Sequence, residues 1–469
     1  METPYRCQCV HPFTCRALVL TGLLVDACLD EEILRQTAAQ LIDAWPVLGG
    51  QLHRTDILPW ALSTGSTVDF QSRQIDLDVE YWTQKGILPP DTITRPTVVH
   101  SLHVPQLDEM LIFDVPAEPE NVFLMRATVL RDATLLCFGI SHHLADGRAS
   151  SDVIRAFCDL LSDRPIPTLV LPPDARGGRM SDRVVMPRDP LHPIPAIGYA
   201  EHLGNFTSGF WPIFLLLAAF MWDAVLCAIG LQEPLEEKFI YLPDSWVNAV
   251  RDQALDTLSA LPDSPASDSP SDSPPTKNNI LCAWYLKTLY DPLPPATTPI
   301  DLYGPLDYRP MLQPPPAGQY WLHNSIGLLR QPLTTRQIQH ASMAALAARL
   351  RHTTLRYTTP HSIQAYLRLC EDHASQRLLP RVRGRGPMPM VLVTPWTGFD
   401  LAGLDFSGAC RGGGRARVMF VNPLIRHRRQ GRWPSAVVSK SLRGGYWMRA
   451  WNTRSGWRGV ERGAGSGLG

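Results

Sequence analysis

The stretch from Leu135 to Leu161 constrains the fold of this chain most, and it reads LLCFGISHHLADGRASSDVIRAFCDLL. Leu135–Ile140 is an apolar run with the length and aliphatic content of a buried strand. Gly147 supplies a flexible turn, and the apolar residues after it recur at helical spacing. The stretch therefore predicts a strand, a tight turn and an amphipathic helix. A histidine at the end of a rigid strand can project into a cleft, so SHHLADG is the candidate site.

His142 and Asp146 form a His-x-x-x-Asp pair in this turn. A neutral imidazole, with a pKa of about 6.5, can take a proton from an alcohol as that alcohol attacks a carbonyl. The alternative is a packed core histidine bonded to a backbone carbonyl, with Asp146 capping the next helix. The motif by itself favours neither interpretation. Asp146 is interpreted as structural, because four residues further on, past the turn, it need not point at a substrate.

Length and composition indicate a large globular protein. A chain of 469 residues is long enough for two large domains, and 45% apolar with 19% charged residues is ordinary for a soluble chain. The balance of 44 basic and 44 acidic residues gives no overall attraction to nucleic acid or anionic membrane. Ten dilute cysteines without a paired CxxC ladder indicate reduced thiols and no metal site. No secretory signal is recognisable, so a cytoplasmic location is expected.

Short strands and helices alternate through both halves of the sequence, which predicts an α/β (mixed α+β) protein of two domains. The expected strands are 16–24, 121–130, 133–140 and 390–394, and the expected helices are 30–44, 242–258, 280–289, 334–351 and 360–370. We expect an N-terminal domain at 1–185, a crossover connection at 186–205, and a C-terminal domain at 206–469. Pro, Gly and Arg dominate the region of the crossover, where hydrophobic periodicity is weak.

Two segments of the expected C-terminal domain have unusual composition. Phe210–Ile229 is the most apolar stretch and is long enough to span a bilayer, but Asp223 inside it costs about 2–3 kcal/mol at mid-membrane. A buried or membrane-surface helix is therefore favoured over a true span, with peripheral membrane contact through 210–229 left open. Residues 261–276 read LPDSPASDSPSDSPPT, which cannot bury apolar surface and predicts a disordered loop.

The chain from Arg411 onward is a basic Gly/Arg-rich tail, with thirteen Lys/Arg against one acidic residue. It has three interpretations: a solvated surface, a patch near a nucleotide's phosphates at Arg411, Arg415 and Arg417, or an RGG-like RNA-binding segment. Strand-like VMFV and SAVV within the tail favour the folded surface, and no nucleic-acid partner is expected. Strongly salt-dependent binding would be the signature of the RNA alternative.

Several stretches, read together, resemble one enzyme family. HHLADG is similar to the HxxxDG signature of the BAHD acyltransferases, especially the divergent fungal ones of secondary metabolism. The resemblance runs from about residue 16 to 407. It also rests on LLVDACLDEEILRQTAAQLIDAWPVLGGQLHR, EKFIYLPDSWVNAVRDQA, NNILCAWYLKTL, PLDYRPMLQPPPAGQYWLHNSI and ALAARLRHTTLRY.

The resemblance implies a two-domain fold like that of chloramphenicol acetyltransferase, with a channel between the domains. His142 would be the general base midway along that channel, and His143 only its neighbour. Asp146 would brace the loop by pairing with Arg309, next to the turn at Gly147. Thr394 falls where the family places a polar active-site residue, Trp396 is near it, and Asn324 matches the family's GN position. All three are expected to bind substrate. Arg309, Gly147 and Asp405 would have structural roles.

Two motifs depart from the family pattern. Asp405–Ala409 reads DFSGA where the family has DFGWG, which keeps Asp405 and Phe406 but loses the Trp. That motif resembles a structural turn, so its change bears on stability more than on chemistry. The Ser/Thr expected before the helix at 280–289 is replaced by Lys277–Asn279.

The resulting hypothesis is an O-acetyltransferase. Acetyl-CoA would be the co-substrate, with no bound cofactor and no metal, and the acceptor a hydroxyl of a terpenoid, meroterpenoid or polyketide. The enzyme is expected to be a monomer. The alternative is a catalytically impaired BAHD-like binding protein, which the altered DFSGA turn and the extended tail would favour.

Overall fold

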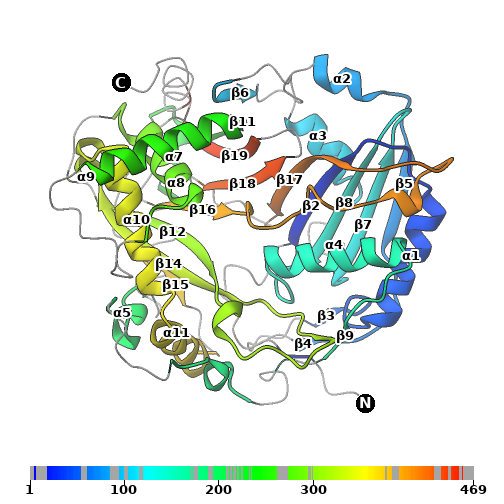
Figure 1. Cartoon of the computed structure of the whole chain (residues 1–469), viewed down its shortest axis with the longest axis horizontal. Coiled ribbons are helices and arrows are strands. Elements are labelled where there is room, and N and C mark those ends of the chain that lie inside the picture. Colours follow the sequence, from blue (N-terminus) through cyan, green and yellow to red (C-terminus); the bar gives the residue numbers. More distant parts are fainter. Residues whose placement is uncertain are drawn as a thin grey trace.

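The computed structural model describes most of the chain. The described residues are 5–6, 18–53, 61–84, 94–99, 104–115, 120–170, 172, 178–187, 194–207, 211, 214, 218, 221–222, 225–231, 233, 235–260, 273–293, 297, 299–374, 378–382, 390–426, 435–441, 445–453 and 457. Within them the chain forms two large sheets, each flanked by helices (Figure 1). The expected mixed α/β fold class is confirmed.

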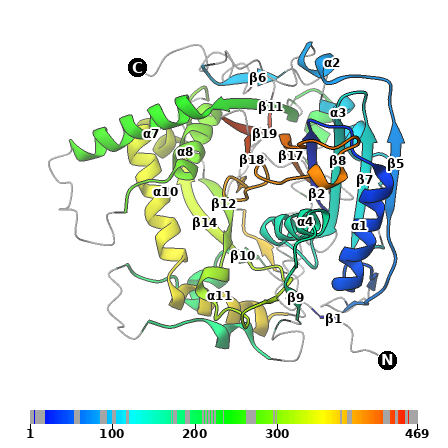
Figure 2. The same ribbon diagram turned by 45° about the vertical axis from the view of Figure 1, so that its right-hand side comes forward.

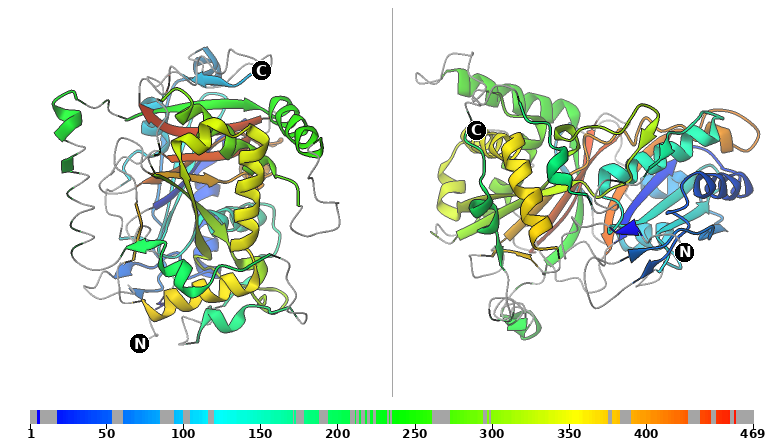
Figure 3. Two further views of the ribbon diagram at one scale, coloured as in Figure 1. Left: turned by 90° about the vertical axis from the view of Figure 1, so that its left-hand side faces the viewer. Right: turned by 90° about the horizontal axis from the view of Figure 1, so that it is seen from below.

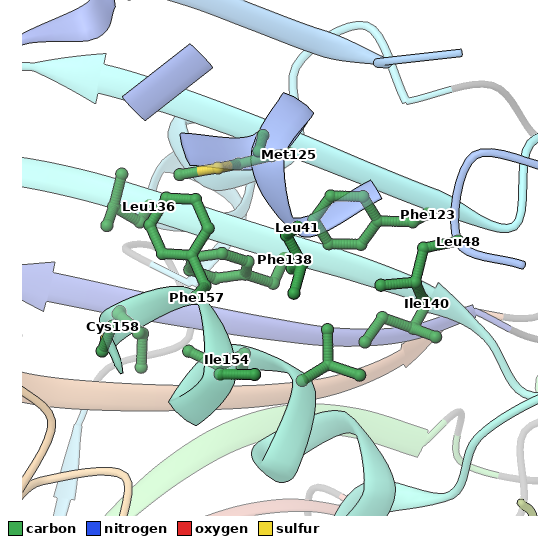
Figure 4. Close-up of a cluster of buried hydrophobic side chains, with 14 of the residues drawn as sticks. Leu41, Leu48, Phe123, Met125, Leu136, Phe138, Ile140, Ile154, Phe157 and Cys158 are labelled. Carbon is green, nitrogen blue, oxygen red and sulfur yellow. The ribbon is translucent and has the colours of Figure 1, made fainter. Parts of the chain in front are cut away.

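The first sheet, with its helices, is the N-terminal half. Its five strands run in the order β17 (Val418–Arg426), β2 (Leu18–Val25), β8 (Thr134–Ser141), β7 (Phe123–Val129) and β5 (Phe70–Gln74). Helices α1 (Glu31–Ala44) and α4 (Gly147–Leu161) cover one face. Side chains of β8 alternate between faces. Phe138 and Ile140 pack under α1 and α4 (Figure 4), whereas Leu135 and Cys137 belong to a second cluster on the other face.

The second sheet, with its helices, is the C-terminal half. Its seven strands run in the order β14 (Ile326–Thr334), β12 (Pro299–Asp307), β16 (Met390–Pro395), β18 (Ser435–Ser441), β19 (Gly445–Thr453), β11 (Leu235–Pro243) and β6 (Thr97–Val99). The helices that pack on it are α7 (Asp244–Ser259), α8 (Lys277–Tyr290), α9 (Thr335–His340) and α10 (Met343–Tyr357). A separate cluster holds α11 (Pro360–Asp372) against α5 (Tyr199–Leu203) of the crossover region.

The remaining elements are short. They are β1 (Tyr5–Arg6), β3 (Leu52–His53), β4 (Ala61–Leu62), α2 (Val79–Gln84), α3 (Val104–Leu111), β9 (Thr168–Leu169), η2 (Met180–Arg183), β10 (Phe206–Thr207), η4 (Arg309–Met311), β13 (Gln319–Tyr320), β15 (Leu379–Pro380) and η5 (Ser407–Ala409). Three small sheets pair β4 with β1 and β3, β10 with β15, and β13 with β9. The pairing of β9 with β13 links the two halves.

The two large sheets exchange strands. β6 comes from the first hundred residues but joins the C-terminal sheet, whereas β17 lies near the end of the chain and pairs with β2 of the N-terminal sheet. Figures 1 and 2 show β17 beside β18 where the sheets meet. Residues 206–469 therefore do not form a self-contained unit. The expected boundaries around 186–205 stay a prediction.

A buried ion cluster joins the sheets at this meeting point. The guanidinium of Arg449, on β19, is 2.6 and 2.9 Å from the carboxylate oxygens of Asp108 on α3, and it also pairs with Glu237 on β11. Its Nη1 donates to the side-chain oxygen of Asn422 on β17 at 3.2 Å. Arg449 is only 3% exposed, so its cation is buried. Four elements from both halves meet at this cation.

Most element predictions are confirmed, including the helix that begins after Asp30 and the β7–β8 hairpin. The single helix expected over 334–351 is wrong, because it ends at His340 and a new helix starts after Ser342, whose side chain caps it.

The loop expected at 261–276 lies outside the described residues except for 273–276. Thr276 is the N-cap of α8 and forms a capping box with Asn279, so a Thr does precede this helix after all.

The apolar segment 210–229 is described only in part. Among its described residues, Trp211, Trp222 and Ile229 are exposed by 60% or more, so this part is not a buried helix. Figure 3 shows these helical pieces standing apart from both sheets. No described helix has both the length and the apolar character needed to cross a membrane.

The basic tail is folded over its described residues, but it is not merely a surface. It supplies β17, β18 and β19, which lie where the two sheets meet. Arg411 pairs with Glu31 at 3.0 Å and Arg417 with Asp26 at 3.4 Å, so both arginines are engaged by carboxylates of the N-terminal half.

Candidate active site

The turn between β8 and α4 carries the candidate base. Every residue of β8 is buried, and the strand ends at Ser141, whose carbonyl accepts hydrogen bonds from the backbone N–H groups of Leu144 and Ala145. His142 and His143 therefore lie in a closed turn at the end of a rigid strand, with exposed fractions of 6% and 0%. This position is the one predicted from the sequence, and it restricts access to His142 from bulk solvent.

Asp146 closes the turn in two ways. Its Oδ1 accepts the backbone N–H of Ala149 at 2.9 Å, which caps α4, and its Oδ2 lies 2.8 Å from Nη2 of Arg309. Oδ2 also accepts the backbone N–H of Ser325 at 2.7 Å. Burial alone raises the pKa of Asp146, but Arg309 and the two N–H donors outweigh burial and hold that pKa below its ordinary value. The expected contact with Arg309 is present, and so is the helix cap.

Residues 309–325, which we call the crossing segment, hold the turn from the opposite side. Asn324, 1% exposed, donates its side-chain N–H to the backbone carbonyl of His142 at 2.8 Å. Arg309 also donates to the carbonyl of His323, which ties the segment back on itself. The candidate base is therefore positioned by contacts from both halves of the molecule. Whether Asn324 also contacts a substrate stays a prediction.

Gly147 is required by the aromatic side chains packed beside it. A Cβ there would lie 2.9 Å from Cε2 of Phe399 and 3.0 Å from Cε2 of Trp396. The centroids of the two aromatic rings lie 5.6 Å apart, and Trp396 is only 2% exposed. The ring of Trp396 therefore packs against the turn at Gly147. Its predicted role in substrate binding stays a prediction.

Thr394 lies on the sheet face that is turned toward the N-terminal half. On β18, Val437 is paired with Thr394 on one side and with Arg449 on the other, and residues directly paired across strands share a face. Arg449 contacts Asp108 and Asn422 of the N-terminal half, which fixes the orientation of that face. Thr394 is half-buried there, two residues before Trp396, so its hydroxyl can face a substrate held between the halves.

Asp405 is not part of this group. Its carboxylate accepts the backbone N–H of Ser407 at 2.9 Å, and the Ser407 hydroxyl also bonds to it, which lowers the pKa of Asp405. The next residue, Phe406, is fully buried between Phe138 and Phe157. The DFSGA sequence thus forms a turn against the core of the N-terminal half, and Ser407 provides a local partner for Asp405.

Sequence reasoning missed three residues that organise the site. Ser325 acts through its backbone N–H, which leaves no side-chain signal in a sequence. Tyr320 bonds to Asp152 on α4 at 2.8 Å, a contact between residues 168 positions apart. Neither pair is marked by spacing or by periodicity, and only the fold brings the partners together.

Comparisons with known proteins agree with this architecture. No family model matches the chain. Acetyltransferase peniE of Penicillium patulum is 36% identical over 490 residues, covering 98% of each chain. O-acyltransferase ausP of Aspergillus calidoustus is 24% identical and covers 95% of this chain and 91% of its own.

Solved structures show the same fold at low sequence identity. F. graminearum TRI101 complexed with coenzyme A and T-2 mycotoxin has a TM-score of 0.65 at 14% identity, covering 97% of this chain and 95% of its own. Vinorine synthase has a TM-score of 0.61 at 13% identity, covering 98% and 92%. Relatedness over almost the whole length and a shared fold lead to one conclusion: the chain belongs to the BAHD acyltransferase family, among the acetyltransferases of fungal secondary metabolism.

Proposed function

We propose that this enzyme moves the acetyl group of acetyl-CoA to a hydroxyl group of a terpenoid, meroterpenoid or polyketide, with His142 as general base. The observation that carries this proposal is the turn at the end of β8, which the crossing segment holds at two points: Arg309 pairs with Asp146, and Asn324 donates to the carbonyl of His142. A base must hold a fixed position relative to the proton that it removes. The complex of TRI101 with coenzyme A and T-2 mycotoxin supports this class of co-substrate and acceptor.

In the proposed reaction the His142 imidazole takes the proton of the acceptor hydroxyl while the hydroxyl oxygen attacks the thioester carbonyl. A carbon–oxygen bond forms, the carbon–sulfur bond breaks, and the CoA thiolate takes up the proton from the imidazolium. The negative charge that develops on the carbonyl oxygen needs a hydrogen-bond donor. Thr394 is our candidate, because its hydroxyl lies on the face turned toward the N-terminal half.

Substitution of the base tests the assignment. His142→Ala should lower the turnover of labelled acetyl-CoA with a panel of alcohols by about 10²–10⁴-fold, because the proton then has no acceptor. His143→Ala, at the neighbouring position, is the comparison that separates a base from a packed histidine. Turnover by His142→Ala near that of the unmodified enzyme, with both variants folded, would contradict the proposal. Labelled acetyl-CoA left untouched by the unmodified protein would instead favour the binding-protein alternative.

We also propose that the enzyme is a monomer that touches a membrane surface through 210–229. At 3.6 residues per turn, the large apolar side chains described there fall on one side of a helix. They are Trp211, Phe214, Met221, Trp222, Val225 and Ile229, all exposed. Tryptophan favours the membrane–water interface, which makes a bilayer surface the partner that this face fits.

Vesicle binding and solution mass test this second proposal. The unmodified protein should sediment with phosphatidylcholine vesicles, and the Trp211→Ser/Trp222→Ser variant should remain in the supernatant. Val185→Ser, which changes another exposed apolar residue, is the matched control and should sediment normally. Equal sedimentation of all three proteins would contradict membrane contact through this face. Light scattering on vesicle-free protein should give the mass of one chain, and a mass of two chains would contradict the monomer.

A further inference from the structure

The crossing segment leaves the C-terminal half, docks on the N-terminal half, and then returns to its own sheet as β14. In Figure 1 it passes below α4 toward β9. Its β13 portion pairs with β9, through hydrogen bonds from the backbone N–H of Thr168 to Gly318 and of Val170 to Tyr320. Leu322 is fully buried in the core of the N-terminal half. The segment is therefore anchored just before it reaches Asn324.

Tyr320 makes the most specific of these anchoring contacts. Its ring stacks on Trp45 with centroids 5.5 Å apart and an interplanar angle of 8°. Its hydroxyl donates to Oδ2 of Asp152 at 2.8 Å, and Asp152 lies on α4, the helix that starts at the candidate site. Burial and the neighbouring Asp152 carboxylate raise the pKa of Tyr320, so the hydroxyl keeps its proton and stays the donor.

The order of residues along the segment connects this anchor to the base. Asn324, four residues after Tyr320, donates to the carbonyl of His142, and Ser325 donates to Asp146. The hydroxyl of Tyr320 contacts α4 through Asp152. Its backbone pairs with β9, which fixes the register of the segment. A shift at Tyr320 would therefore move Asn324 relative to His142.

We propose that Tyr320 and Asp152 are positioning residues for His142, which act through Asn324. This inference rests on the proposed function, in which His142 is the base. Their hydrogen bond fixes the crossing segment on α4, and the segment in turn fixes the backbone of the base. Neither residue touches the reacting atoms in this assignment. Their contribution belongs to the chemical step and leaves the binding of acetyl-CoA unchanged.

The test compares variants of the full-length enzyme. Tyr320→Phe keeps the stacking on Trp45 but removes the donor, and should lower kcat about five- to tenfold while KM for acetyl-CoA stays within about twofold. Asp152→Ala should give the same loss, whereas Asp152→Asn, whose side-chain oxygen still accepts, should restore most of kcat. The Tyr320→Phe/Asp152→Ala double variant should lose no more than either single variant.

A matched control removes a comparable bond elsewhere. Tyr199 donates to Asp372 at 3.2 Å on the surface of the C-terminal half, so Tyr199→Phe should leave kcat unchanged. Amide hydrogen exchange over residues 141–147 gives a readout that does not depend on the identity of the base, and exchange should speed up in Tyr320→Phe but not in Tyr199→Phe.

Three results would overturn the assignment: unchanged kcat in Tyr320→Phe, a loss confined to KM, or a loss of kcat without faster exchange at 141–147. Additive losses in the double variant would also count against it. Failure of the base assignment is recognised separately, because it depends on turnover by His142→Ala and not on Tyr320.

Discussion

At the scale of single residues, the candidate base is held through its backbone. The contacts that position it run to the carbonyl of His142 from Asn324 and to the carboxylate of Asp146 from Arg309 and Ser325. The bond from Asn324 goes to the backbone carbonyl of His142 and not to its imidazole. The ion pair between Asp146 and Arg309 thus contributes geometry, in agreement with the structural role expected for Asp146.

Gly147→Ala tests how tightly the turn is packed. A methyl group at this position would meet Phe399 and Trp396 at 2.9–3.0 Å, so the rings or the turn must move, at a cost of about 1–3 kcal/mol. We expect lower free energy of unfolding in urea and lower kcat. Gly398→Ala is the control, because a Cβ at Gly398 meets no atom within 4 Å. Equal free energies of unfolding for the two variants would show that the turn accommodates a methyl group without loss of stability.

At the scale of elements, both ends of α4 are fixed by other segments. Asp146 caps its first turn, and at its last turn a Cβ on Gly408 would lie 1.9 Å from the carbonyl oxygen of Leu161. The DFSGA turn therefore keeps a glycine where the helix end approaches most closely. Loss of the family's Trp is compatible with this packing, since Phe406 fills the adjacent core.

A buried histidine on helix α5, in the crossover region, should make the stability of the fold depend on pH. His202 is buried against α11, and its Nε2 lies 3.0 Å from the carbonyl oxygen of Ser362. Burial lowers the pKa of His202 to about 4. The unfolded chain, with an ordinary pKa of about 6.5, then binds a proton that the folded protein excludes, so stability is full above that value and falls as pH drops from about 6.5 to 4.

The expected loss across this range is up to about 3 kcal/mol. Urea unfolding measured from pH 7.5 to pH 4 should show it, and His202→Gln should flatten the dependence. The exposed His361→Gln variant should keep the slope of the unmodified protein. A slope that survives in His202→Gln would assign it to another group.

At the scale of the whole molecule, the two halves are joined by the Arg449 cluster. Arg449→Met would leave the carboxylates of Asp108 and Glu237 without their cation and should lower the free energy of unfolding by about 3–5 kcal/mol. Arg35→Met, which breaks the exposed pair with Glu32, should leave the free energy of unfolding nearly unchanged. Chemical denaturation measures both, and equal costs would mean that the cluster does not stabilise the interface.

The distance along the chain over which a sequence signal acts decided which features could be predicted. Local periodicity and capping residues gave the β8–turn–α4 unit and the start of α1, because such signals act within a few residues. The break at Ser342 was missed, since a cap inside a periodic run leaves the apolar spacing intact. Contacts such as Tyr320 with Asp152 depend on strand order, which no local pattern encodes.

The exchange of β17 also has a consequence during protein synthesis. β2 is made early, but the strand that covers its outer edge, Val418–Arg426, is made only after strands β11, β12, β14 and β16 of the other sheet. Until then, the N–H and C=O groups of that edge lack their final partners, and such an edge can pair with other chains. The N-terminal sheet therefore cannot be completed until much of the C-terminal half has been made.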